Sequence, residues 1–385
     1  VAAFGDSHVD RPPWTSYIAA VAAASRDPVL QWFHETFGEE TTDPVAFLWH
    51  DLTLRAISPL DAGLPLGKAF PAHGGCLVAR TDWSPDATRC IVYGKAGREE
   101  NHEHNDVGNL CIDAFGERLI VDLGSPSGYP ADYFDEGRYR YYNASVHGHN
   151  VLMFDETEMR VPVRKRGEPV GDQATRLSGQ IVRSEFADDK GAVWTIDCTN
   201  AYDEVIQVVR SVLFLTPGIV VVLDQASLPR ERKVSLRWHT IVSCAPGNNG
   251  AFQFQTERSR LVGQVVPLAG NVTFRSGHHD YKAPYNHDRE GDLLEQRHEP
   301  YVEVLAKTSQ FEAATLFVAG PVGEKPVWVP RSDGWTLQGS DVGCKVTIED
   351  NKIAVVDTRD GRTWEVNRLR FAVRSPSVVP PATKY

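Results

Sequence analysis

The sequence predicts a mainly β protein: a large antiparallel β-sandwich preceded by a short α-helical segment. From Leu66 onward, runs rich in β-branched and aromatic residues alternate with Gly, Pro and Asn-Asp clusters, roughly every 8 to 15 residues. Almost no helical period is found in that part, and many strands joined by turns favour an antiparallel sandwich. We therefore divide the chain into a helical segment, residues 1–65, and a sandwich, residues 66–385, with a smaller β subdomain as an option from about residue 300.

Three short helices are expected within the first sixty or so residues. Asp27-Pro28 and Asp43-Pro44 each place a capping acid before a proline that suits the first helical turn. Apolar residues lie at helical spacing after or before these caps: Leu30, Phe33 and Phe37, then Val45, Leu48 and Leu52, with Tyr17, Ile18 and Val21 ahead of both.

Strands are expected in the apolar runs between the turn signals. These runs include Cys90 to Tyr93, Leu119 to Leu123, Val151 to Phe154, Val205 to Phe214, Ile219 to Leu223, Val234 to His239, Tyr301 to Ala306, Ala314 to Val318 and Ile353 to Asp357. The polar stretch from Ser276 to Glu299 contains four His and many charges, and it is interpreted as an exposed loop.

Composition excludes several classes of protein. The 385 residues are 42% hydrophobic and include nine Trp, which is enough to bury a sizeable core. The net charge of −11 makes a nucleic-acid partner unexpected, so a polyanionic ligand would need a local basic patch or a metal. No run approaches 18 apolar residues, so membrane insertion is not expected. A start at Val1 indicates a processed secretory product or a piece of a longer chain, and most of the six cysteines are interpreted as buried small apolar residues.

The densest chemical signal lies between Asn101 and Asn150. His102 and His104 are two apart, so on an extended segment both imidazoles point to one face, and one metal could use either or both. Asp122 ends an apolar strand, and His149 stands at the start of another. Two His nitrogens and one Asp oxygen, with a fourth position for water or substrate, form a reasonable zinc site. The alternative is that these histidines are ordinary hydrogen-bonded residues and that Asn105-Asp106 is only a turn.

Three segments in this order resemble the heparinase II/III-like polysaccharide lyases. They are the run from His102 to Leu110, the run from Gly116 to Gly124, and His149-Asn150-Val151 after a Tyr-rich loop. Gly5-Asp6-Ser7 and the following helices resemble the last turns of the helical toroid that precedes the sandwich in this family.

The resemblance implies a site and a reaction. His104, Asp122 and His149 match the family's metal ligands, usually zinc, and His102 matches the histidine that points into the cleft. Tyr139 or Tyr133 is expected to approach the sugar. The implied reaction is β-elimination on a uronic acid of an anionic polysaccharide, of the glycosaminoglycan or alginate type. A periplasmic or secreted location follows from that substrate class, and a homo-oligomer is an option. Arg138 and Arg140, beside the tyrosines, are candidates to pair with a substrate carboxylate or sulfate, with solvated surface arginines as the alternative.

About 65 residues are too few for a complete toroid, which needs several more helical hairpins. We therefore expect either a portion of a lyase that holds half of the cleft, or a non-catalytic, metal-stabilised β-sandwich module that binds glycan or protein. A metal-dependent hydrolase or cupin-like oxygenase with the same ligands is a third interpretation.

Overall fold

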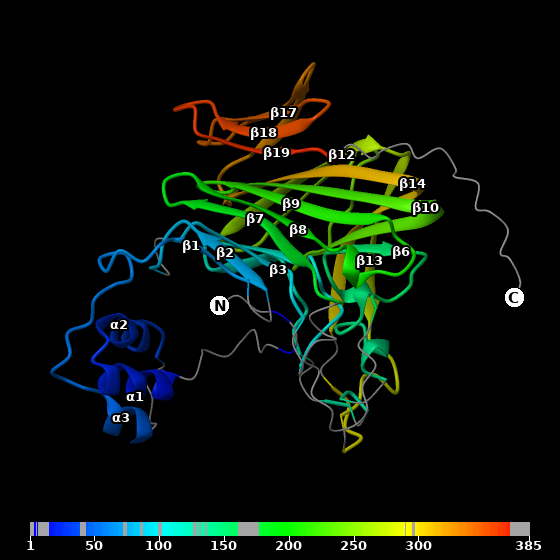
Figure 1. Cartoon of the computed structure of the whole chain (residues 1–385). Coiled ribbons are helices and arrows are strands. Elements are labelled where there is room, and N and C mark those ends of the chain that lie inside the picture. Colours follow the sequence, from blue (N-terminus) through cyan, green and yellow to red (C-terminus); the bar gives the residue numbers. More distant parts are fainter. Residues whose placement is uncertain are drawn as a thin grey trace, which may run out of the picture.

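The computed structural model of the chain is built mainly from three antiparallel β-sheets that lie one above the other (Figure 1). It describes residues 4, 6, 15–38, 44–71, 75–84, 88–98, 102–125, 129–130, 132–134, 137–160, 177–288, 290–294 and 297–369. The predicted fold class, a mainly β sandwich after a short helical segment, is confirmed. Within the described part of the chain, no helix is long and apolar enough to cross a membrane.

The helical segment lies beside the sheets and consists of α1 (Thr15–Ser25), α2 (Pro28–Phe37) and α3 (Pro44–Trp49) (Figure 1). Asp27 caps α2 as predicted, since its carboxylate accepts hydrogen bonds from the backbone nitrogens of Val29 and Leu30 at 2.8 and 3.2 Å. The second predicted cap, Asp43, lies outside the described residues.

Strands of the first sheet pair in chain order: β1 (Gly67–Phe70), β2 (Cys76–Arg80), β3 (Cys90–Lys95), β4 (Leu110–Ala114) and β5 (Glu117–Ile120). The central sheet has nine strands among the described residues and the main order β11-β12-β14-β10-β9-β8-β7, with β13 paired to β14 and β6 to β10. Its bounds are β6 (Leu152–Phe154), β7 (Gln180–Ala187), β8 (Gly191–Asp197), β9 (Gln207–Leu215), β10 (Ile219–His239), β11 (Ala251–Gln255), β12 (Ser259–Ala269), β13 (Val272–Asp280) and β14 (His298–Pro321). The third sheet contains β15 (Val327–Arg331), β16 (Gly334–Gln338), β17 (Cys344–Ile348), β18 (Lys352–Asp357) and β19 (Thr363–Asn367). Short 3-10 turns occur at η1 (Arg138–Arg140), η2 (Val146–Gly148) and η3 (Thr199–Ala201).

Both faces of the central sheet are buried at the start of β10, which explains why residues 219–223 are apolar without interruption. Along β10, Val220 and Val222 pack in the core shared with the first sheet, whereas Val221 and Leu223 pack in the core shared with the third sheet. This alternation follows from the period of two in a strand. Four of the six cysteines are buried, as the sequence predicts.

Two predictions about strand ends are wrong. The runs at 219–223 and 234–239 were expected as separate strands, but both belong to β10, and 301–306 and 314–318 both belong to β14. β10 pairs with β14 on both sides of its exposed charged part, residues 229–231, and the register shifts between Ser227 and Arg232. A short polar stretch between two apolar runs is expected both for a turn between two strands and for a bulge within one strand. The sequence pattern alone therefore does not distinguish the two.

The stretch 276–299 is not wholly a loop. β13 continues to Asp280 and β14 starts at His298, so its ends form a hairpin that extends beside the loops after β5 (Figure 1). The sequence left open a smaller β subdomain from about residue 300. In the structure β14 stays in the central sheet to Pro321, and the third sheet begins at Val327.

Candidate functional site

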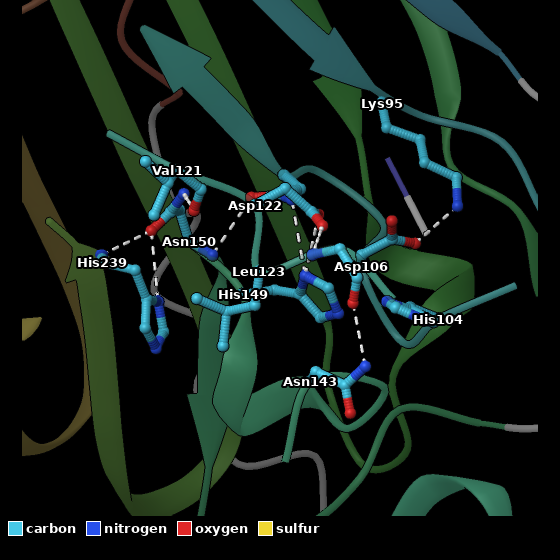
Figure 2. A network of polar contacts seen from close by, with 12 residues as sticks. Lys95, His104, Asp106, Val121, Asp122, Leu123, Asn143, His149, Asn150 and His239 are labelled. Atoms are coloured by element: carbon cyan, nitrogen blue, oxygen red, sulfur yellow. Dashed lines mark hydrogen bonds and ion pairs between the residues drawn. The ribbon is translucent and has the colours of Figure 1, made fainter. Parts of the chain in front are cut away.

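His104, Asp122 and His149, the three predicted metal ligands, lie close together in the interior of the protein (Figure 2). His104 stands in the loop before β4, Asp122 lies two residues after the end of β5, and His149 lies between η2 and β6. One candidate ligand atom of each residue lies within 4.8 Å of the other two, and all three residues are 0% exposed. The two imidazole rings lie 5.2 Å apart, centroid to centroid.

Neighbouring amides hold this trio in place. Oδ2 of Asp122 accepts hydrogen bonds from Nδ2 of Asn109 at 2.7 Å and from Nδ1 of His149 at 3.1 Å. Oδ1 of Asp122 accepts the backbone N–H of Gly124 at 2.9 Å. The Asn150 amide donates to the carbonyls of Leu110 and Val121, both at 2.9 Å, and so joins the strands on either side.

The donor set fits a divalent cation. Nδ1 of His104 and Nε2 of His149 are buried and have no hydrogen-bond partner among the described residues, and a buried polar atom without a partner is costly. Burial alone would raise the pKa of Asp122, but the charge and hydrogen bond of His149 lower this pKa to about 2, so the carboxylate is ionised. Two imidazole nitrogens and one carboxylate oxygen are ligands that zinc accepts.

Asp6 occupies the centre of a second polar network beside the trio. Its Oδ1 accepts hydrogen bonds from Nε2 of His104 at 2.8 Å and from the Tyr133 hydroxyl at 2.7 Å. Its Oδ2 contacts Nδ1 of His102 at 2.9 Å and Nη2 of Arg138 at 2.7 Å. Burial opposes ionisation, but the hydrogen bond and charge of His104 and the charge of Arg138 bring the pKa of Asp6 below its usual value.

His102 is the solvent-facing member of this network. Its side chain is 49% exposed, and its ring packs edge-on against Phe134 at 5.1 Å. Its φ of 60° is uncommon for a residue other than glycine. Such backbone conformations cluster at functional sites, where the surroundings hold them.

Two predicted site residues, Tyr133 and Arg138, are buried. Tyr133 is 0% exposed, and burial and the charge of Asp6 raise its pKa, so it stays a protonated donor. Arg138 is paired with Asp6, and its side chain is only 10% exposed. From the sequence, Tyr133 was expected to approach the sugar, and Arg138 to pair with a substrate anion or to be a solvated surface arginine. Tyr139 is half-buried and its pKa is raised by burial and by the charge of Glu103, while Arg140 is exposed.

Buried ion pairs support the loop that contains His102 and His104. Nζ of Lys95 lies 2.7 Å from Oδ1 of Asp106, and Nη1 of Arg98 lies 3.0 Å from Oε1 of Glu103. Asp106 therefore has a structural role in an ion pair with β3, which the turn interpretation did not include.

A heparinase II/III-like C-terminal family model matches residues 72–374. The chain belongs to the heparinase II/III-like family. Solved structures with the same fold include a heparinase III gene product, at 14% identity and a TM-score of 0.65 over 95% of this chain and 49% of that chain. Another is the heparan sulfate lyase HepC from Pedobacter heparinus, at 16% identity and a TM-score of 0.64 over 95% and 49% of the two chains. The chain thus spans about half the length of these lyases, and at such identities the likeness shows the fold. A comparison with curated proteins gave no match.

Sequence reasoning about this family member missed the role of Asp6. The residue is 96 positions before His102 and 127 before Tyr133, and only its similarity to the end of a toroid singled it out. No local pattern marks a residue as the partner of a distant histidine.

Proposed function

We propose that this chain is a polysaccharide lyase, or a portion of one, that cleaves a uronic-acid-containing anionic glycan by β-elimination. The observation that carries the proposal is the exposed imidazole of His102, hydrogen-bonded to the buried carboxylate of Asp6 beside the His104, Asp122 and His149 trio. Family membership supports it, because related folds include heparan sulfate lyase HepC.

His102 is the proposed base. β-Elimination removes the weakly acidic proton next to the uronate carboxylate, and histidine suits this step because its ordinary pKa lies near 6.5. The Asp6 carboxylate accepts Nδ1–H, which selects the neutral tautomer with Nε2 as the basic nitrogen. Asp6 also accepts from Arg138, whose charge balances the buried carboxylate.

Two residues that follow Arg138 in η1 are proposed to stabilise the charge that develops on the substrate and to protonate the leaving group. Arg140 is exposed two residues from Arg138 and would pair with the uronate carboxylate, so that negative charge developing on the substrate is stabilised. Tyr139 keeps its proton because burial raises its pKa, and it would donate a proton to the departing glycosidic oxygen.

His104, Asp122 and His149 would hold the metal, most simply zinc. When bound, the ion supplies a fixed positive charge in the interior. Because all three ligands are fully buried, the residues that contact solvent and substrate lie outside this trio. His104 links the metal trio to the proposed catalytic base, since its Nε2 hydrogen-bonds to Asp6, the same carboxylate that orients His102.

The substrate is proposed to be a glycosaminoglycan or an alginate-type polyuronate, met in the periplasm or outside the cell. The net charge of −11 repels such chains, so binding depends on local positive groups such as Arg140.

The test is an ultraviolet assay for unsaturated uronate, run with the full chain on heparin, heparan sulfate, chondroitin sulfate and alginate. We expect a rising absorbance with at least one substrate and its loss in His102→Ala. Silence on every substrate, while the chain still binds glycan with similar affinity in both variants, favours the second candidate, a metal-stabilised binding module. That candidate draws on the complete burial of the trio, which is typical of a structural ion.

A further inference from the structure

A second His/Asp cluster lies on the β13–β14 hairpin, outside the site described above. His278, Asp280 and His298 each offer one ligand atom within 4.8 Å of the other two. Nε2 of His278 lies 3.1 Å from Oδ2 of Asp280, and Nδ1 of His298 lies 2.9 Å from Oδ1 of the same carboxylate. The two imidazole rings are stacked with centroids 4.4 Å apart.

We propose that His278, Asp280 and His298 form a second, solvent-exposed site for a divalent transition-metal ion such as zinc, with water completing the coordination. Two imidazoles and a carboxylate match zinc in number and chemical type. With metal–ligand bonds of about 2.0–2.2 Å, two ligand atoms on one tetrahedral ion lie roughly 3.3 Å apart. The two N···O distances, each to a different oxygen of Asp280, are close to that value.

The backbone presents these side chains together. His278 and Asp280 are two apart on β13 and therefore share a face, and Asp280 pairs directly with His298 on β14. The three side chains are 53%, 48% and 52% exposed, so an ion can reach them from solvent.

The opposite face of the same hairpin packs on the loop of the candidate active site. His279 stacks on Tyr142 with ring centroids 3.9 Å apart and an interplanar angle of 3°. Farther along, Tyr285 packs edge-on against Tyr141 at 4.9 Å. An ion on the outer face would hold the ends of β13 and β14 together and keep the inner face against this loop.

Arg297 connects the proposed ion to the buried trio. It directly precedes His298, and its guanidinium donates to the carbonyls of Leu123 and Ser125 at 2.5 and 3.0 Å. Those carbonyls follow Asp122 in the chain. Ion binding at His298 is therefore expected to slow backbone opening near Asp122 as well as in the hairpin.

The test uses the full chain, zinc titration by calorimetry, elemental analysis and hydrogen exchange. We expect two zinc ions per wild-type chain, and one in His278→Ala and in Asp280→Asn, with His287→Ala as a control on the same connection that keeps two. His104→Ala should lose the buried ion and keep the hairpin ion, so the two sites are separable.

In protein whose buried site is already loaded with zinc, further zinc should slow amide exchange in residues 281–288 and around Leu123 in the wild type, and not in His278→Ala. Equal zinc stoichiometry in the wild type and both hairpin variants would overturn the site. Zinc binding that leaves exchange in both segments unchanged would overturn the coupling to the candidate active site and leave an adventitious surface ion.

Discussion

Oδ2 of Asp6 lies 2.9 Å from Nδ1 of His102, although the two residues are 96 positions apart in the chain. This contact joins the helical part of the chain to the loop before β4. The other oxygen of Asp6 accepts a hydrogen bond from His104, one of the three candidate metal ligands. Asp6 thus links the exposed imidazole of His102 to the buried trio.

Replacement of His102 should separate activity from stability. We expect His102→Ala to lower turnover by about 10²–10⁴-fold, the usual contribution of a positioned general base. The melting temperature should change little because the side chain is half exposed. His147→Ala is the control, since its ring pairs with Glu158 away from Asp6. Wild-type rates in His102→Ala would remove this residue from the mechanism.

Asp6 should act as a positioning residue. Asp6→Asn keeps the shape but removes the charge that Arg138 and the two histidines contact. We expect kcat to fall more than tenfold, by the amount that misorientation of a catalytic group costs, with a smaller change in KM. Partial rescue of kcat by Asp6→Glu is the accompanying readout. A fall in melting temperature with unchanged kcat would instead indicate a purely structural role.

The buried trio should bind metal and stabilise the fold. His104→Ala is expected to release the ion and to lower the free energy of unfolding by about 3–5 kcal/mol, as when one partner of a buried charged pair is lost. Metal content by elemental analysis and urea unfolding provide the measurements. Carefully purified wild-type protein without any divalent metal would contradict this prediction.

Arg210 should hold the two loops that carry the site. Its guanidinium binds Asp224 at 2.7 Å, the Gly108 carbonyl at 2.7 Å and the Asn150 carbonyl. Arg210→Met leaves the buried Asp224 unpaired, so we expect a loss of about 3–5 kcal/mol in urea unfolding. Arg210→Met combined with Asp224→Leu should recover part of it. Arg230→Gln, from an exposed pair with Glu204, should cost at most about 1 kcal/mol. An additive double variant would contradict the pairing.

The third sheet should contribute a pH-dependent part of the stability through Asp357. Hydrogen bonds from Arg359, and then from Arg362, lower the pKa of this carboxyl, whose side chain is 0% exposed. A lowered pKa stabilises the fold above the unfolded pKa of about 3.9, and this stability is lost as the pH falls through the lower folded value. Asp357→Asn should cost about 1–3 kcal/mol at pH 7, and the gap to the wild type should narrow below about pH 4. Asp360→Asn, whose side chain is 49% exposed, is the control. A gap that stays constant down to acid pH would contradict the role of this carboxylate.

Much of the site could be predicted because its signals are local. Imidazoles two apart at His102 and His104, a carboxylate at the end of an apolar strand and a histidine before the next strand are visible in the sequence, and the structure brings His104, Asp122 and His149 together. Their metal-binding role stays a prediction. The burial of Tyr133 and Arg138 could not be predicted, since a polar loop at the surface and one folded over a buried carboxylate have the same composition.

The sequence by itself determined that the chain is mainly β, where most strands lie and that α2 begins after Asp27, because strand period, turn residues and caps act within a few residues. Only the tertiary structure decided that two pairs of runs join into β10 and β14, that Asp6 contacts His102, and that His278 and Asp280 meet His298. Such contacts depend on how sheets pack and in which register strands pair, and residues far apart in the chain carry no local mark of their partners.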